Sequence, residues 1–189
     1  MLDELIRKSR SIRRFDEDYN ISYDMLYDFV NALRYTPSTV NLQALRYKII
    51  VDKRECEYVF DNLKWAGLLK GRGTPVKGER PSAYIFILCD KNVANELHYD
   101  EGIAAQTIML LAAEKDLGGC ILGSINRDNI ADNFGIDTDR YSIDLVCALG
   151  KPKQNTIIKD IHYGEPTAYY RDEEGNHYVP KIITDDLII

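Results

Sequence analysis

The segment Gly102–Ala113 constrains the fold most, because it is apolar on nearly every side. Within it only Gln106 and Thr107 are polar. A surface helix shows a single apolar stripe, so a helix over this segment must be buried on several sides. Two arrangements satisfy that requirement: a central helix wrapped by its own domain, or a helix in a subunit interface. We favour the interface, because a chain of 189 residues has little core with which to wrap a helix completely.

The rest of the chain alternates amphipathic segments with short apolar runs, which predicts helices packed on a sheet. Helices are expected near residues 2–10, over Ser22–Tyr35 with Ser22 as N-cap, over residues 53–63, and over Asp100–Leu117 with Gly118 and Gly119 ending it. Strands are expected over Tyr47–Asp52, Ala83–Asp90, Cys120–Ser124 and Ile143–Gly150.

Charge and composition exclude several classes of protein. Lys and Arg number 24 against 30 Asp and Glu, a formal net charge of −6, whereas a general nucleic-acid binder needs a broad basic surface. No uncharged run approaches the roughly 20 residues of a membrane span, and the first residues lack the apolar core of a secretion signal. The cysteines form no CxxC pair, which favours a reduced cytoplasmic compartment and argues against a zinc site; they are Cys56, Cys89, Cys120 and Cys147.

The composition of the chain changes after residue 150. We expect residues 1–155 to form the core and residues 156–189 to form a C-terminal arm, which is polar and rich in tyrosine. The stretch Ala168–Pro180 predicts a hairpin around Glu174 and Gly175. Because the arm has no clear apolar core, it needs another surface to lie on, and this also favours a dimer.

The segment SRSIRRF, Ser9–Phe15, places three arginines among two serines in an acidic chain. Whether it is extended or continues the preceding helix, Arg10 and Ser11 can offer a guanidinium and a hydroxyl to a phosphate. The alternative is that these arginines pair with the acidic run Asp16–Asp18 or lie in water.

Two further segments carry polar or glycine-rich patterns. The segment TPSTVNLQ, Thr36–Gln43, lies between a helix and a strand and supplies hydroxyls and amides. A turn explains most of it but explains Gln43 poorly, since an amide there suits the edge of a heteroaromatic ring. In GGCILGS, Gly118–Ser124, the absence of a side chain at Gly123 would let a flat ligand approach the backbone. A strand that ends in a turn is the alternative.

Taken in order, these segments resemble the FMN-dependent nitroreductase family. The family's R-x-S-x-R/K-x-F/Y pattern is matched by Arg10, Ser11, Arg13 and Phe15, without the residue that often separates the first Arg from the Ser. Its P-S-x-x-N-x-Q pattern is matched by Pro37, Ser38, Asn41 and Gln43. Its D-x-G-x-A-A-Q helix, which runs into a G-x-x-G-S turn near Cys120–Ser124, is matched by Asp100, Gly102, Ala104, Ala105 and Gln106. Pro180 and Lys181 resemble the family's basic residue on the FMN phosphate.

The resemblance implies a role for each of these residues. Arg10, Ser11 and Lys181 would hold the phosphate, and Arg13 would reach the pyrimidine edge of the flavin, where a cation stabilises the reduced ring. Leu122 and Gly123 would lie against the ring, with a backbone N–H near N5. The partner subunit would contribute Pro37, Ser38, Thr39 and Asn41, Gln43 would contact the ring edge, and the loop Lys70–Lys77 would form a pocket wall.

The fold that the resemblance implies is α+β: a central, mostly antiparallel sheet flanked by helices, with the C-terminal arms exchanged in a homodimer that holds FMN at its interface. NADH or NADPH would give hydride to flavin N5, and a nitroaromatic, quinone or similar small-molecule acceptor would then take it. No protein side chain need act as the catalytic acid or base. The sequence does not choose between NADH and NADPH, because it has no G-x-G-x-x-G fingerprint.

The chain departs from the family pattern in two places. Ala44 and Leu45 stand where Pro-Trp is frequent, which leaves the acceptor open. Ile182 and Ile183 stand where a second basic residue sometimes occurs, so phosphate binding would depend more on the arginines of Ser9–Phe15. The histidines belong to no motif and are expected at the surface or in turns; they are His98, His162 and His177.

A second hypothesis is a flavin-binding protein without turnover, such as a flavin store or sensor. A third, weaker one is a nucleic-acid contact through RKSRSIRR, against which the net negative charge argues. Substitution of Arg10 and Arg13 separates them, because only the first two hypotheses predict loss of bound FMN.

Overall fold

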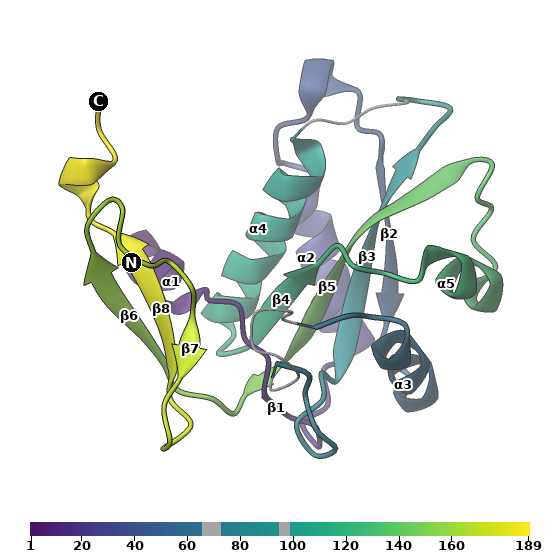
Figure 1. Cartoon of the computed structure of the whole chain (residues 1–189). Helices are drawn as coiled ribbons and strands as arrows, with labels where there is room; N and C mark the ends of the chain where they lie inside the picture. The colour runs from purple at the N-terminus through teal and green to yellow at the C-terminus, as the bar shows by residue number, and fades with distance from the viewer. Residues whose placement is uncertain (66–72, 95–98) are drawn as a thin grey trace.

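An antiparallel sheet forms the centre of the protein (Figure 1). The computed structural model describes residues 1–65, 73–94 and 99–189. Strand β3 (Ala83–Asp90) pairs with β2 (Leu45–Ile50) on one side and with β5 (Tyr141–Pro152) on the other. Strand β5 also pairs with β4 (Gly118–Leu122), and its last two residues pair with the short β1 (Phe15–Asp16). The expected α+β fold with a mostly antiparallel sheet is confirmed.

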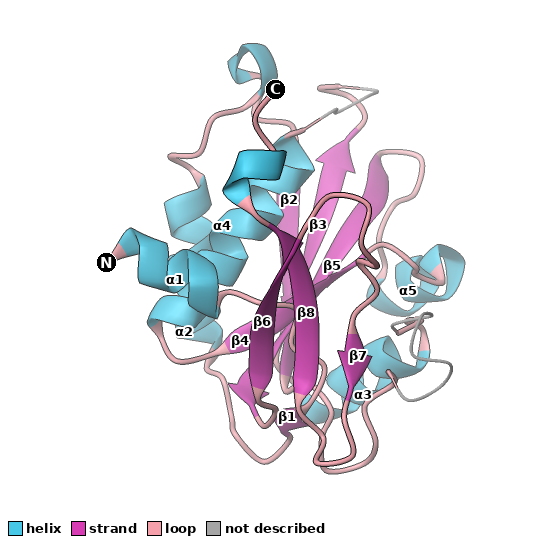
Figure 2. Cartoon of the chain, turned by 60° about the vertical axis from the view of Figure 1, so that its left-hand side comes forward, coloured by secondary structure: helices cyan, strands magenta, loops and turns pink. Residues whose placement is uncertain are grey.

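Helices cover both faces of this sheet (Figure 2). One face packs against α2 (Tyr23–Leu33) and α4 (Asp100–Glu114), and the other against α3 (Lys53–Asp61) and α5 (Arg127–Phe134). The short α1 (Leu2–Lys8) lies beside α4. Because side chains alternate along a strand, β3 contributes to both apolar cores.

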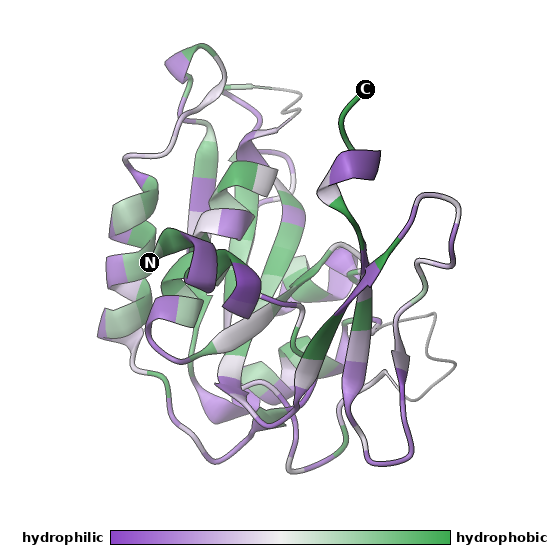
Figure 3. Ribbon diagram, turned by 90° about the vertical axis from the view of Figure 1, so that its left-hand side faces the viewer, coloured by the Kyte–Doolittle hydropathy of each residue, from purple (hydrophilic) through white to green (hydrophobic). Residues whose placement is uncertain are grey.

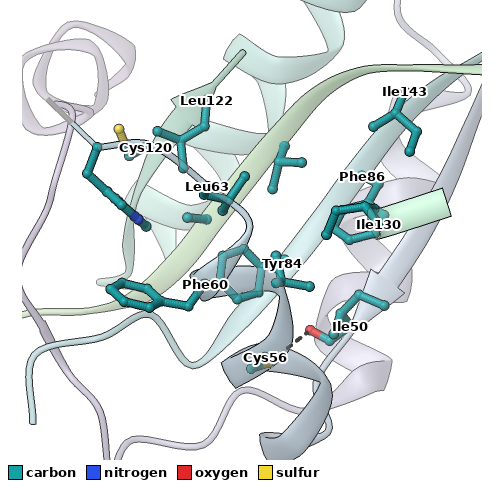
Figure 4. Packing of buried hydrophobic residues seen from close by; sticks show 14 of the residues in the cluster. Ile50, Cys56, Phe60, Leu63, Tyr84, Phe86, Cys120, Leu122, Ile130 and Ile143 are labelled. Atoms are coloured by element: carbon teal, nitrogen blue, oxygen red, sulfur yellow. Dashed lines mark hydrogen bonds between the residues drawn. The ribbon is translucent and has the colours of Figure 1, made fainter. Parts of the chain in front are cut away.

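The core on the α3 and α5 side is rich in aromatic residues (Figure 4). Tyr84 and Phe86 of β3 are fully buried there, beside Phe60 of α3. The thiol of Cys56 lies 3.9 Å from the Ile50 carbonyl oxygen, to which it donates. Burial raises the pKa of this thiol to about 12, so it acts as a small apolar group.

The predicted ends of the helices are confirmed in one case and wrong in another. Ser22 is the N-cap of α2, since its hydroxyl oxygen accepts the Met25 N–H at 3.2 Å. Helix α4 ends at Glu114, before the glycines expected to end it. Asp116 takes the left-handed conformation, with φ of 56°, and Gly118 and Gly119 belong to β4.

Packing explains why the strand needs these glycines. A Cβ atom on Gly119 would lie 2.7 Å from the Ala148 carbonyl oxygen of β5. One on Gly118 would lie 2.6 Å from Ile12 Cγ1. Both glycines therefore allow β4 to approach its neighbours closely. The sequence pattern alone had assigned them to the end of a helix.

The C-terminal arm has a sheet of its own, made of β6, β7 and β8 (Figure 1). Strand β6 (Thr156–Ile161) runs parallel to β8 (His177–Ile182), and β7 (Tyr170–Arg171) pairs antiparallel with β8. The expected hairpin is confirmed, with Gly175 at φ of 86° in its turn. Both apolar and polar residues occur along β6 and β8 (Figure 3), and among residues 156–189 only Ile161, His177 and Pro180 are buried.

Helix α4 is covered by its own domain on most sides. Its buried residues include Ala104, Ala105, Ile108 and Ala112. Gln106 is exposed and Ile103 is half-buried, so one face of the helix stays open. The domain thus wraps the helix incompletely, and whether a second subunit covers the remaining face stays a prediction.

Candidate functional site

The arginine segment that follows α1 is extended and runs along the outer edge of β4. Ser11 forms an isolated parallel bridge with Gly119, and the Ile12 N–H donates to the Gly119 carbonyl at 2.8 Å. Ile12 and Phe15 are buried in the core and anchor the segment. Ser11 itself is exposed. The fold thus fixes the backbone of this segment and leaves the Ser11 hydroxyl accessible beside β4.

Arg10 turns back toward the end of α1. Its Nη2 atom donates to the Ile6 carbonyl at 2.7 Å, while its Nε atom is buried without a hydrogen-bond partner. Burial lowers the pKa of this guanidinium, and such an environment favours an anion as partner.

Arg13 faces the arm. Its guanidinium carbon lies 4.9 Å from the centre of the Tyr169 ring, and its Nε atom is also buried without a partner. Arg14 forms an ion pair with Glu79 at 3.3 Å. Within the described residues, no ion pair joins these arginines to the run Asp16–Asp18. The pairing with Asp16–Asp18 expected in that alternative is therefore not formed, and the unpaired Nε atoms of Arg10 and Arg13 are each free to bind an acceptor.

The loop after α2 is strained and firmly held. Val40, Asn41 and Gln43 all have positive φ, between 50° and 57°, which side chains rarely adopt. The Gln43 N–H donates to the Ser38 hydroxyl oxygen at 3.2 Å. Strain of this kind concentrates at functional sites, where surrounding contacts hold it in place.

Thr39 ties this loop to α4. Its N–H and hydroxyl donate to the carboxylate of Asp100, at 2.9 and 2.7 Å, and Asp100 is 2% exposed. Next to this contact lies a cavity of about 250 Å³ that Pro37, Ser38 and Gln43 help to line. The carboxylate also contributes, after burial, to raising the pKa of Tyr47 to about 12.

The arginine segment and this loop lie at opposite ends of α4. Thr39 contacts Asp100, the first residue of the helix, whereas Ser11 lies beside Gly119, which follows the end of the helix at Glu114. A helix of 15 residues is about 20 Å long. One chain therefore does not bring these two groups of predicted site residues together.

The end of β4 has room for a ligand. Leu122 is buried and Gly123 is exposed. A Cβ atom on Gly123 would meet only Leu145 Cδ2, at 3.7 Å, which is an ordinary contact. The fold itself does not require glycine at this position, unlike at Gly119, and this agrees with a ligand that approaches the backbone there.

Lys181 is exposed on β8, opposite Asp160 of β6. In the part of the chain that the structure describes, no hydrogen bond or ion pair joins it to Arg10 or Ser11. The arm also places Arg171 and His177 near Arg13, and the sequence motifs predicted neither of them as a site residue. The one feature of the sequence that could have indicated them is the mixture of polar and aromatic residues along the hairpin Ala168–Pro180.

His177 is 1% exposed, so its expected place at the surface is wrong. It is the first residue of β8, and the centre of its ring lies 5.4 Å from that of Tyr169. Burial and the charges of Arg13, Arg171 and Arg14 lower the pKa of its imidazole to about 4. His162 is exposed as expected and lies 3.0 Å from the Asp186 carboxylate. His98 and the first part of the Lys70–Lys77 loop lie outside the described residues.

Three general properties bear on the kind of site. The four cysteines are free and buried. Over residues 1–65, 73–94 and 99–189, no group of three His, Cys, Asp or Glu side chains is placed to hold a metal ion. In the same ranges no helix has the length and apolarity that crossing a membrane requires.

Comparison with known proteins identifies the family. The sequence model described as "Nitroreductase family" matches residues 6–151, which confirms the resemblance seen in the motifs. The chain is also 24% identical to YdgI of Bacillus subtilis (strain 168), which carries the name of an NAD(P)H nitroreductase. That alignment covers 78% of this chain and 87% of YdgI.

Solved structures share the fold. A protein of Exiguobacterium sibiricum 255-15, solved in complex with FMN, superposes with a TM-score of 0.67 at 20% identity, over 89% of this chain and 92% of that one. The enone reductase CLA-ER, of a gut-bacterial fatty acid saturation metabolism, superposes with a TM-score of 0.68 at 16% identity, over 86% and 93%. At these identities the likeness concerns the fold alone.

Proposed function

Because the chain belongs to the nitroreductase family, we propose that it is an FMN-dependent NAD(P)H oxidoreductase. The observation that carries this proposal is the pair of buried Nε atoms of Arg10 and Arg13, which lack hydrogen-bond partners on either side of Ser11. Buried cationic donors without acceptors are rare. The FMN phosphate would supply an acceptor to Arg10, and the pyrimidine edge of the flavin would supply one to Arg13. The accessible Ser11 hydroxyl adds a further donor.

The chain's own residues would hold FMN and orient it. Arg10, Ser11 and Lys181 would bind the phosphate, and Arg13 would stabilise negative charge on the pyrimidine edge. Leu122 and Gly123 would lie against the ring at the end of β4. When bound, FMN supplies an N5 atom that accepts hydride from NADH or NADPH and passes it to the acceptor. The protein excludes water and fixes charge around that atom.

We further propose that the protein acts as a homodimer. The open face of α4 lines a shallow hollow with Leu145 of β5, and its residues include Gly102, Ile103 and Gln106. A two-fold partner on this face could bring Ser38, Thr39, Asn41 and Gln43 of one chain to the Ser9–Phe15 segment of the other, which a single chain keeps apart. The arm, residues 156–189, would exchange onto the partner, while residues 1–155 form the core.

The acceptor that we propose is a nitroaromatic, a quinone or a similar small molecule. The solved relatives include an enone reductase, so the fold does not restrict the acceptor to nitro groups. The free, buried cysteines favour a cytoplasmic location. The alternative function is a flavin store or sensor, which would bind FMN without being reduced by a nicotinamide.

The first experiment is a visible absorption spectrum of the purified protein, taken before and after addition of NADH or NADPH without oxygen. A flavin spectrum that bleaches with either reductant supports the oxidoreductase. A flavin spectrum that persists with both supports the store or sensor. A protein that stays colourless after incubation with FMN contradicts both. Ser11→Ala should weaken FMN binding, whereas Lys159→Gln, an exposed change on β6, should not.

A further inference from the structure

A separate cavity lies on the α3 side of the sheet. It has a volume of about 310 Å³ and is formed by the chain between β1 and α2, by α3 with the end of β2 before it, and by the residues that lead into β3. Among the described residues that line it, none belongs to the Ser9–Phe15 segment, the Thr36–Gln43 loop or the end of β4. The function proposed above therefore gives this cavity no task.

The buried part of its lining is apolar and carries one cation. Phe60 is 7% exposed, and Cys56 and Pro81 are also buried. The guanidinium carbon of Arg80 lies 4.4 Å from the centre of the Phe60 ring. Contact with an aromatic face orients a planar guanidinium group. The cavity thus presents an oriented cation beside an apolar surface.

The Arg80 side chain has no anionic partner. Within residues 1–65, 73–94 and 99–189 no carboxylate forms an ion pair with it, and its Nε atom is buried without a hydrogen-bond partner. Glu17, which also lines the cavity, accepts backbone N–H groups instead, those of Gly78 and of Arg80 itself, the latter at 3.2 Å. The guanidinium group is therefore left to bind an anion from outside the chain.

Two hydroxyl groups in the same region also lack partners. Ser82 Oγ, in the cavity lining, and the Tyr84 hydroxyl are buried without a hydrogen bond. Tyr84 is fully buried in the core that contains Phe60 and Cys56 (Figure 4). Burial, and after it Cys56, raise the pKa of the Tyr84 phenol, whereas Arg80 lowers it, so the hydroxyl lies within reach of that charge. Buried hydroxyl groups are nearly always hydrogen-bonded, which indicates that an acceptor belongs here.

We propose that this cavity binds a small carboxylic acid with an apolar body. Its carboxylate would accept hydrogen bonds from Arg80 and Ser82, and its body would lie against Phe60 and Pro81. A carboxylate matches the planar fork of a guanidinium group with two parallel hydrogen bonds.

The charges around the cavity favour a ligand with a single negative charge. Two cations and three carboxylates line it; they are Lys53 and Arg80, and Glu17, Asp18 and Glu57. One unpaired guanidinium group balances one carboxylate, whereas a doubly charged anion such as a phosphate monoester would be repelled by the surplus of acidic side chains.

The first test uses benzoate as probe, with benzyl alcohol as the uncharged reference of similar size. The backbone amide signals of Phe60 and Ser82 in the full-length protein are followed by NMR at constant ionic strength. We expect benzoate to move these signals saturably and benzyl alcohol to bind about 10-fold more weakly or less.

Variants then assign the binding to Arg80. In Arg80→Gln the affinity for benzoate should fall about 10- to 100-fold. Arg54→Gln removes the same charge from an exposed position of α3 outside the cavity and should bind benzoate like the wild type. If Arg80→Gln does not fold, Arg80→Lys, which keeps the charge without the planar fork, replaces it and should weaken benzoate by a smaller factor. Ser82→Ala removes a hydroxyl without a partner in the chain and should weaken benzoate about 3- to 10-fold.

Three results would overturn the site: unmoved signals of Phe60 and Ser82, equal binding of benzyl alcohol and benzoate, or wild-type affinity for benzoate in a folded Arg80→Gln protein. Changes confined to the signals of Leu122 and Gly123 would place the probe at the proposed flavin site and would likewise refute the inference. None of these outcomes depends on reduction of a flavin, so the site is tested separately from the oxidoreductase.

Discussion

Thr39 and Asp100 are joined by both donors of the threonine, whose N–H and hydroxyl point at one buried carboxylate. The N–H lies 2.9 and 3.1 Å from the two oxygens, and the hydroxyl lies 2.7 Å from the nearer one. These bonds attach a loop with three residues of positive φ to the first residue of α4. The loop conformation therefore depends on the charge and acceptor capacity of Asp100.

Replacement of Asp100 by asparagine tests this dependence. One of the two acceptor oxygens becomes an amide that cannot accept the Thr39 N–H, and the free energy of unfolding should fall by about 1–3 kcal/mol. FMN affinity should also fall, because the proposed site needs the loop in place. Urea unfolding and flavin titration measure the two effects. Asp24→Asn, at an exposed carboxylate in the first turn of α2, is the control, and equal stability of both variants would contradict the role of Asp100.

Two glycines of the β4 region should respond in opposite ways. Gly119→Ala places a Cβ atom 2.7 Å from the Ala148 carbonyl oxygen and 2.8 Å from Met109 Sδ, so we expect a loss of about 1–3 kcal/mol in the free energy of unfolding. Gly123→Ala meets only Leu145 at 3.7 Å, so stability should change by less than about 0.5 kcal/mol.

The same pair tests the flavin site. If flavin lies against the end of β4, Gly123→Ala should weaken FMN binding in a protein of normal stability. Thermal unfolding and flavin fluorescence titration give both values for each variant. A Gly123→Ala protein that binds FMN as tightly as the wild type would remove this glycine from the proposed site.

The open face of α4 is where we expect the two subunits of the proposed homodimer to meet. Ile103 is half-buried on this face and lines the hollow near Leu145. Ile103→Glu should raise the dimer dissociation constant about 30-fold or more, because a charge would enter the apolar centre of the interface. Sedimentation velocity over a range of concentrations measures this. Lys115→Glu, at the exposed end of the same helix, should leave the dimer intact.

Much of the fold followed from local patterns. The N-cap at Ser22, the continuous apolar run of β3 and the turn at Gly175 depend on neighbouring residues, and the sequence predicted each of them correctly. Helix α5 was missed, because its eight residues are polar apart from Ile130, Ala131 and Phe134. The glycines of β4 were assigned to a helix end, since only the distant Ile12 and Ala148 show why that strand must lack side chains.

The candidate site was predictable only as separate segments. Motif order identified Arg10, Ser11, Arg13 and the Thr36–Gln43 loop, but their separation along α4 depends on tertiary structure. His177 was misplaced although its hairpin was predicted, because no periodic apolar pattern in the hairpin shows which of its side chains are buried. Arg171 was missed for the same reason, since its importance depends on contact with a residue far along the chain.

His177 should make the protein sensitive to acid. Its pKa is lowered from about 6.5 to about 4 by burial and by Arg13, Arg171 and Arg14, so the unfolded chain binds a proton in this range before the folded one does. The stabilising effect of the neutral imidazole is therefore complete above about pH 6.5 and is lost as the pH falls toward 4.

We expect this residue to account for about 2–3 kcal/mol of the stability lost between pH 7 and pH 4. The free energy of unfolding is measured in urea at each pH, in buffers without phosphate, for the wild type and for His177→Gln. Carboxylates such as Asp90 and Asp116, whose pKa values are lowered by Arg140 and by Lys8, titrate in both proteins and cancel in the difference. If the free energy of unfolding has the same pH dependence in the wild type and in His177→Gln, the prediction is contradicted, because the imidazole then binds its proton equally well in the folded and the unfolded chain.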